Sequence, residues 1–68
     1  MKIILNGEEI LINNNISLLD LLELKNISQK NIAIEKNRKI ITKNSWRKEK
    51  LNENDIIEVI TAVGGGEV

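Results

Sequence analysis

The feature that most constrains this chain is an apolar, β-branched run at residues 56–63 that leads directly into consecutive glycines at 64–66. A short run of this kind is typical of a buried strand. Glycine has no Cβ and loses the most backbone freedom on ordering, so the glycines favour a flexible peptide. A frayed terminus is the simpler alternative. We expect a folded domain over 1–63 and a flexible, functional, glycine-rich tail over 64–68.

The composition limits the chain to one domain and excludes several kinds of chemistry. A chain of 68 residues buries only about 60% of its unfolded surface, which suffices for one core. It has no Cys and no His, so a disulfide framework, a thiolate and the usual zinc ligand are excluded, and no metal site is expected. Trp46 is the only aromatic residue, which predicts an aliphatic core.

The charge balance argues against nucleic acid and membrane partners. Ten basic residues balance ten acidic ones, which leaves no net electrostatic attraction to a polyanion. Lys36, Arg38 and Lys39 cluster at a turn, but no aromatic residue accompanies them for base stacking. No apolar run approaches the roughly 20 residues that span a bilayer, and Met1–Asn6 is too short for a signal peptide. The cytoplasm is the expected compartment.

The chain opens with a predicted β-hairpin. Residues 2–5 are apolar, Asn6-Gly7 suits a tight turn in which both central residues need positive φ, and residues 8–13 alternate polar and apolar. The two-residue period places one set of side chains inward and the other outward. The inward set is Ile3, Leu5, Ile10 and Ile12, and the outward set includes Ile4 and Leu11.

A short helix is predicted next. Ser17 and Asp20 have the spacing of a capping box in its acidic variant. The leucines at 18, 19, 21, 22 and 24 then give a broad apolar face, and Lys25-Asn26 is a suitable stop. A helix this short persists only by packing against a sheet.

The remaining pattern completes an α+β fold. We expect strands at 31–35 and 39–41, a turn anchored by Trp46, a buried Leu51, and the final strand from Ile56. One helix must cover one face of the sheet, with the first hairpin and the last strand as natural neighbours in its middle. The prediction is a β-grasp roll with a mixed sheet of four to five strands and one main helix. Its expected core is Ile3, Leu5, Ile10, Ile12, Leu19, Leu22, Ile32, Ile34, Leu51, Ile57 and Val59.

Several segments together follow the pattern of a known family. They are Ile3-Ile4-Leu5-Asn6-Gly7, Ser17-Leu18-Leu19-Asp20-Leu21-Leu22, Ile32-Ala33-Ile34-Glu35-Lys36-Asn37, Trp46, and the stretch from Asn54 to Gly66. Through them the chain resembles the ThiS family of sulfur carriers in bacterial thiamine biosynthesis, and more broadly the ubiquitin-like sulfur carriers. The glycine tail is the most specific element. The alternative within the fold is the small subunit of molybdopterin synthase, which is usually longer and richer in Phe.

The resemblance implies a carrier and substrate, not an enzyme, with no bound cofactor. A ThiF-like activating enzyme would adenylate the carboxylate of Gly66 with ATP and magnesium. A cysteine-desulfurase relay would then supply sulfur for a thiocarboxylate, and a ThiG-like thiazole synthase would take that sulfur. Gly64 and Gly65 are the expected tail-recognition residues, since side chains there would clash with a narrow channel.

The chain departs from the family pattern at its end. Glu67 and Val68 follow Gly66, and while they remain Gly66 carries an amide that cannot be adenylated. Either a C-terminal peptidase trims them or the chain has left the carrier role; we favour trimming.

Two other classes of function are alternatives to the carrier. A partner-docking patch of Ile4, Leu11 and Ile60 is expected on the open face of the sheet. Such a patch would also serve a ubiquitin-like protein-binding module without sulfur chemistry, and a thiocarboxylate on the trimmed chain would distinguish the two. An enzyme is disfavoured because the carboxylates are scattered among Lys and Arg and no nucleophile–base pair is visible.

Overall fold

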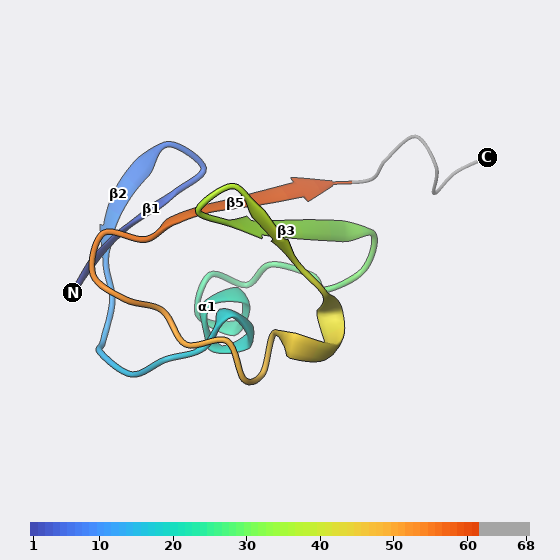
Figure 1. The fold of residues 1–68 in the computed structure, drawn as a ribbon, viewed down its shortest axis with the longest axis horizontal. Helices are drawn as coiled ribbons and strands as arrows, with labels where there is room; N and C mark the ends of the chain where they lie inside the picture. Colours follow the sequence, from blue (N-terminus) through green and yellow to red (C-terminus); the bar gives the residue numbers. More distant parts are fainter. Residues whose placement is uncertain (62–68) are drawn as a thin grey trace.

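Two β-hairpins and a final strand build one five-stranded sheet. The computed structural model describes residues 1–61. Figure 1 shows the elements in chain order, and their bounds are β1 (Lys2–Leu5), β2 (Glu8–Leu11), α1 (Leu18–Leu24), β3 (Ile32–Lys36), β4 (Lys39–Ile41), a 3₁₀ turn (Lys43–Ser45) and β5 (Ile56–Thr61). The predicted boundary at residue 63 and the tail lie outside the described residues.

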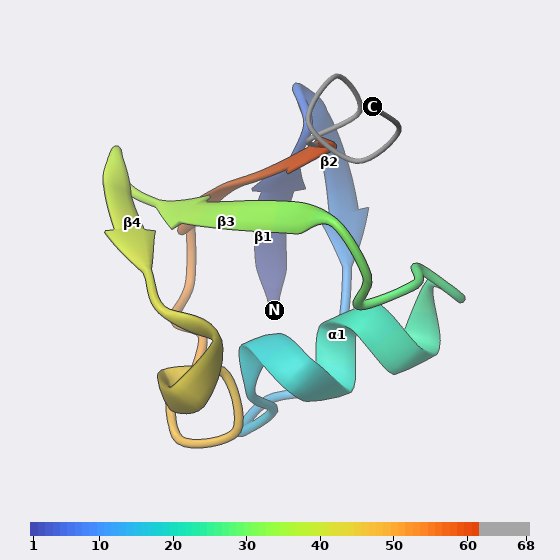
Figure 2. The same ribbon diagram turned by 90° about the vertical axis from the view of Figure 1, so that its right-hand side faces the viewer.

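The sheet has mixed topology with its last strand at the centre. The strand order is β2-β1-β5-β3-β4. β5 runs parallel to β1 and antiparallel to β3, and both hairpins are antiparallel. Figure 2 shows α1 lying across one side of this sheet, while no other described helix covers the opposite side. The α+β, β-grasp prediction, with one helix on a mixed sheet, is confirmed.

Both hairpin turns place two successive residues in the left-handed region. Asn6 and Gly7 have φ of 50° and 85°, as the first turn was predicted to require. Asn37 and Arg38, with φ of 53° and 71°, close the second hairpin in the same way. Asn tolerates this region better than most residues because its short polar side chain can bond locally.

The predicted capping box starts α1. The Ser17 hydroxyl accepts a hydrogen bond from the Asp20 backbone N–H at 3.1 Å, and the Asp20 carboxylate accepts one from the Ser17 N–H at 3.0 Å. Leu18, Leu21 and Leu22 form the buried face of the helix. The prediction of a broad apolar face was too wide, because Leu24 is 59% exposed.

The core is aliphatic with one indole, as predicted. Its buried members come from the sheet, the helix and the connecting segments: Ile3, Leu5, Ile12, Leu18, Leu21, Leu22, Ile34, Trp46, Leu51 and Ile57. The predicted set omitted Leu18 and Leu21. The predicted residues Ile10, Leu19, Ile32 and Val59 instead pack at the margin and are only partly buried. None of the helices in residues 1–61 has the length and apolar character needed to cross a bilayer.

Candidate functional site

The strand that leads toward the glycine run is held on both sides. The start of β5 is bonded to β1 and its turn: the Ile4 N–H donates to the carbonyl of Asp55, just before β5, and the Asn6 N–H donates to the Ile57 carbonyl, each at 2.9 Å. On its other side β5 pairs with β3 from Lys36↔Ile57 to Ile32↔Thr61. A central strand with both edges paired has little freedom to shift register. Pairing with β1 fixes the start of β5, and pairing with β3 continues to Thr61.

A buried carboxylate fixes the start of β5. The side chain of Asp55 is almost fully enclosed and accepts hydrogen bonds from the Asn52 N–H at 2.8 Å and the Asn37 amide at 3.0 Å. The Lys36 ammonium lies 3.8 Å from the same carboxylate and 2.6 Å from Glu49. Buried charges are stable when paired and hydrogen-bonded in this way. The network ties the turn before β5 to the β3–β4 hairpin.

The open face of the sheet carries the predicted docking residues at separate places. Ile4 on β1 is half-buried and lies opposite Ile56 on β5. Leu11 is 83% exposed beside Lys2, and Ile60 is 44% exposed beside Ala33. Along β5, Glu58 separates Ile56 from Ile60. All three predicted residues share the open face, and their role as a docking patch stays a prediction.

Two further apolar residues on this face were missed by the sequence reasoning. Ile56, which is 47% exposed, and Ile40 on the edge strand β4 both point outward. The two-residue period that places Ile57 and Val59 inward already places Ile56 outward, so the signal was present. A hollow of about 290 Å³ lies on the same face, lined by Glu35, Arg38, Ile56 and Glu58. Acidic and basic groups therefore border the apolar residues.

The predicted tail residues Gly64, Gly65 and Gly66 lie outside the described residues. Within residues 1–61, no group of three or more Asp, Glu, His or Cys side chains gathers in a way that could hold a metal ion. What the described part offers is a firmly paired exit strand and an exposed, partly apolar sheet face. This arrangement suits docking to a protein partner.

The chain is similar to several known proteins. Residues 2–66 match the model of the ThiS family. The uncharacterized protein ycf40 of Trieres chinensis is 39% identical over 62 residues, which are 91% of this chain and 85% of that protein. The thiazole synthase of Paramagnetospirillum magneticum is 30% identical over 66 residues. The matched segment is 97% of this chain but only 20% of that protein's length.

A solved structure has the same fold. The crystal structure of the thiamine biosynthesis protein ThiS from Geobacter metallireducens superposes with a TM-score of 0.86, covering 97% of this chain and 100% of that one. The two sequences are 19% identical, so this likeness bears on the fold alone.

Proposed function

The chain belongs to the ThiS family, and from this membership we propose that it is a sulfur carrier of thiamine biosynthesis, with Gly66 as the residue that carries sulfur. In this proposal the Gly66 carboxylate attacks the α-phosphorus of ATP and pyrophosphate leaves. A persulfide donor then displaces AMP to form an acyl disulfide, and a thiol cleaves its S–S bond, which leaves the thiocarboxylate on Gly66 and a disulfide on the donor side. The chain is the substrate of a ThiF-like activating enzyme, which would supply the ATP and magnesium site.

The observation that carries the proposal is the extent of the family match. It runs through the glycines and ends at Gly66, with Glu67 and Val68 beyond it. An internal Gly66 has an amide carbonyl, which is not a nucleophile toward ATP. The proposal therefore includes removal of Glu67 and Val68 by a peptidase. Without trimming, the carboxylate offered to ATP would be that of Val68. Its β-branched side chain is stiff and bulky beside the reacting centre.

The sulfur acceptor we propose is a ThiG-like thiazole synthase. The support is the relative from Paramagnetospirillum magneticum, in which a segment similar to 97% of this chain is part of a protein named thiazole synthase. A carrier segment and an acceptor in one polypeptide gain a high effective concentration for each other. In separate polypeptides, docking through a folded surface has to supply that proximity. A cysteine-desulfurase relay would feed the sulfur.

The open face of the sheet is the proposed docking surface. Ile4 and Ile56 adjoin one another across β1 and β5, and Ile60 lies further along β5, nearer the glycine run. Ordering each residue of a flexible peptide on binding costs roughly 1–2 kcal/mol. Apolar contacts on the sheet face can offset that cost by about 25 cal/mol per Å² buried. A partner that contacts Ile60 would hold the carrier with its C-terminal segment toward the active site.

The test uses two forms of the chain, one with all 68 residues and one that stops at Gly66. With the activating enzyme of the same organism, the shorter form should support exchange of pyrophosphate into ATP, and the full chain should not. Gly65→Val in the shorter form should abolish exchange and leave thermal unfolding unchanged, since position 65 follows the last core residue. Equal exchange by both forms would reject the trimming step.

A second measurement separates the carrier from a binding module without sulfur chemistry. The intact mass of the protein isolated from its own cells should correspond to a chain ending at Gly66, with a fraction carrying sulfur in place of one carboxylate oxygen. A trimmed chain that never carries sulfur, even after incubation with the activating enzyme, ATP and a sulfur donor, would reject the carrier role.

A further inference from the structure

The charges of this neutral protein are strongly segregated along the chain. Seven of the ten basic residues lie between Lys36 and Lys50, and Glu49 is the only acidic residue there. The rest of the chain holds three basic and nine acidic residues. A net charge of zero therefore conceals one strongly basic surface, formed by β4 and the segment that follows it. Local potentials of this kind steer charged partners even when the whole molecule is neutral.

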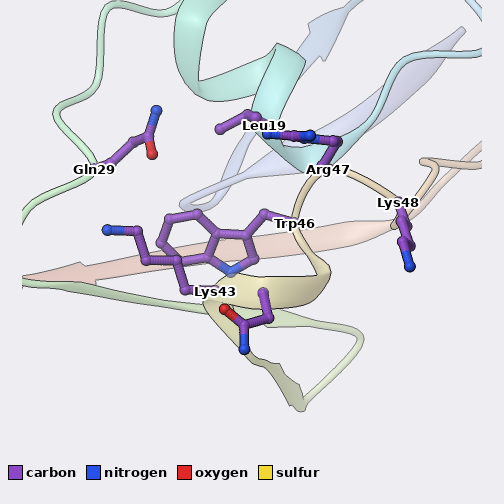
Figure 3. Close-up of a pocket in the computed structure, with 7 residues that line it drawn as sticks. Leu19, Gln29, Lys43, Trp46, Arg47 and Lys48 are labelled. Carbon is purple, nitrogen blue, oxygen red and sulfur yellow. The ribbon is translucent and has the colours of Figure 1, made fainter.

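Part of this basic surface surrounds a pocket. The pocket has a volume of about 340 Å³ and is lined by Leu19, Gln29, Lys43, Asn44, Trp46, Arg47 and Lys48. Figure 3 shows the indole of Trp46 in the middle, with Gln29 on one side, Arg47 extending beside Leu19, and Lys48 on the far side. The volume falls within the range of small-molecule and side-chain sites. Cationic groups, amides and an apolar floor are thus combined in one place.

The scaffold beneath the pocket is firmly held. The Trp46 indole N–H donates to the Ile41 carbonyl at 2.9 Å, and the Trp46 carbonyl accepts from the Leu19 N–H at 3.2 Å. The carbonyl of Ser45 accepts from both Lys48 and Glu49 N–H, at 3.0 and 2.9 Å. These bonds fix the backbone that carries the cations, so less conformational entropy is lost when a ligand binds.

The three cations at the pocket have no acidic partner within residues 1–61. The ion pairs in that part of the chain involve only Lys2 and Lys36. Glu49, the one carboxylate in the basic segment, lies 2.6 Å from the Lys36 ammonium and is already paired. Lys43, Arg47 and Lys48 are exposed and remain available to an external anion.

We propose that this pocket binds a carboxylate side chain from an acidic segment of a protein partner. An Arg guanidinium can bind a carboxylate through two parallel hydrogen bonds, and lysine ammonium groups add charge from other directions. Three cations line the pocket, so an acidic segment that carries several carboxylates can be held by more charges than one small anion can. This inference does not depend on the sulfur chemistry, since it concerns a different surface from the open sheet face.

An acidic protein segment fits better than a nucleic acid. The only aromatic side chain, Trp46, is 3% exposed and cannot stack with a base. The nine acidic residues on the remainder of the molecule would also repel a long polyanion that extends past the pocket. A short acidic segment would contact only the basic surface around the pocket, so it would avoid that repulsion.

The experiment uses the full chain and a capped peptide of alternating glutamate and aspartate as the probe. Trp46 is the sole tryptophan, so its indole N–H resonance reports directly on the pocket. Titration at low ionic strength should shift that resonance in a saturable way, and added salt should reverse the shift. A neutral peptide of asparagine and glutamine should have no effect.

Matched variants locate the site. Lys43→Gln and Arg47→Gln should each weaken peptide binding by about two- to fivefold, the value of one exposed ion pair. Lys25→Gln, the same change on an exposed lysine beyond the end of α1, should leave affinity unchanged. The substituted side chains are exposed, and an unshifted indole resonance in the free variants verifies their fold.

Four results would overturn the proposal. The first is the absence of a peptide-induced shift at low ionic strength. The second is equal loss of affinity with Lys25→Gln. The third is tighter binding of a single-stranded RNA oligonucleotide than of the peptide, which would make the ligand a nucleic acid. The fourth is saturation by inorganic phosphate with the affinity of the peptide, which would make the site one for small anions.

Discussion

The side chain of Asn6 joins the first turn of the chain to its last strand. Its Oδ1 accepts a hydrogen bond from the backbone N–H of Val59 at 2.9 Å, 53 positions further on. Its own N–H donates to the Ile57 carbonyl at 2.9 Å. β1 ends at Leu5, so the Asn6 side chain adds one more bond to the parallel β1–β5 pairing. The same residue has a φ of 50° and forms the turn.

Replacing Asn6 should separate these two roles. Asn6→Gly keeps the positive φ accessible but removes the acceptor, so it should cost about 0.5–1.5 kcal/mol and speed hydrogen exchange at the Val59 amide. Asn6→Ala should cost roughly 1–2 kcal/mol more because Ala disfavours the left-handed region. Chemical denaturation and amide exchange provide the two readouts. Unchanged exchange at Val59 in Asn6→Gly would show that the side-chain bond contributes nothing in solution.

Ile57 and its neighbour Ile56 form a matched pair for testing the core. Ile57 is fully buried and Ile56 is 47% exposed. Ile57→Ala should lower the free energy of unfolding by about 2–5 kcal/mol, whereas Ile56→Ala should change it by about 0.5 kcal/mol or less. Urea denaturation of both variants gives the comparison. Similar losses from the two would mean that the inward and outward faces of β5 are assigned wrongly.

The capping carboxylate of Asp20 predicts a pH dependence. The pKa of Asp20 is lowered, chiefly because the carboxylate accepts a hydrogen bond from the Ser17 backbone N–H. Folding thus favours its charged form, so this stabilisation is present above the unfolded pKa of about 3.9 and is lost as the pH falls through the folded pKa. Asp20→Asn should destabilise the protein at neutral pH, and the difference from the unsubstituted chain should shrink below about pH 4.

The control for Asp20→Asn is Glu23→Gln, which removes one negative charge from the same helix at a position outside the capping box. Urea denaturation across the acidic range should show the narrowing difference for Asp20→Asn only. A difference that stays constant down to about pH 2 would assign the effect of Asp20 to something other than its ionisation.

The proposed docking surface can be tested by placing a negative charge either on the open face of the sheet or on the helix α1. Ile60→Asp and Ile56→Asp should each weaken binding to the proposed activating enzyme by about tenfold or more, because a carboxylate would lose its hydration in an apolar contact. Leu24→Asp, at a position 59% exposed on α1, should have no effect. Calorimetric titration with each variant measures the change. Equal losses from Leu24→Asp and Ile60→Asp would place the interface elsewhere.

Local chemistry accounts for the parts of the fold that the sequence predicted well. The Asn6-Gly7 turn and the Ser17/Asp20 cap depend on residues at fixed short spacings, and both were confirmed. The strand faces followed from a two-residue period that does not depend on the partner strand. The third strand begins one residue later than predicted, at Ile32, which is the usual uncertainty at an element's end.

The features that the sequence predicted wrongly or not at all depend on how helices, strands and loops pack against each other. Five leucines in a short helix allow several buried stripes, and the packing of α1 buries Leu18, Leu21 and Leu22 more fully than Leu19. The pocket beside Trp46 and the Asp55 network join segments that are far apart in sequence, so no local pattern predicts them. The predictions for Gly64, Gly65 and Gly66 stay untested predictions.

The central position of β5 has a consequence for biosynthesis. A ribosome makes this strand after every other described element, yet β1 and β3 need it between them to become one sheet. Until it emerges, the first hairpin and the second can pair only within themselves, and each alone is marginally stable. These elements should therefore remain unfolded on the ribosome until β5 has emerged. A premature stop before β5 should therefore yield an unfolded product that proteases degrade, so cells would not accumulate a partly folded sheet.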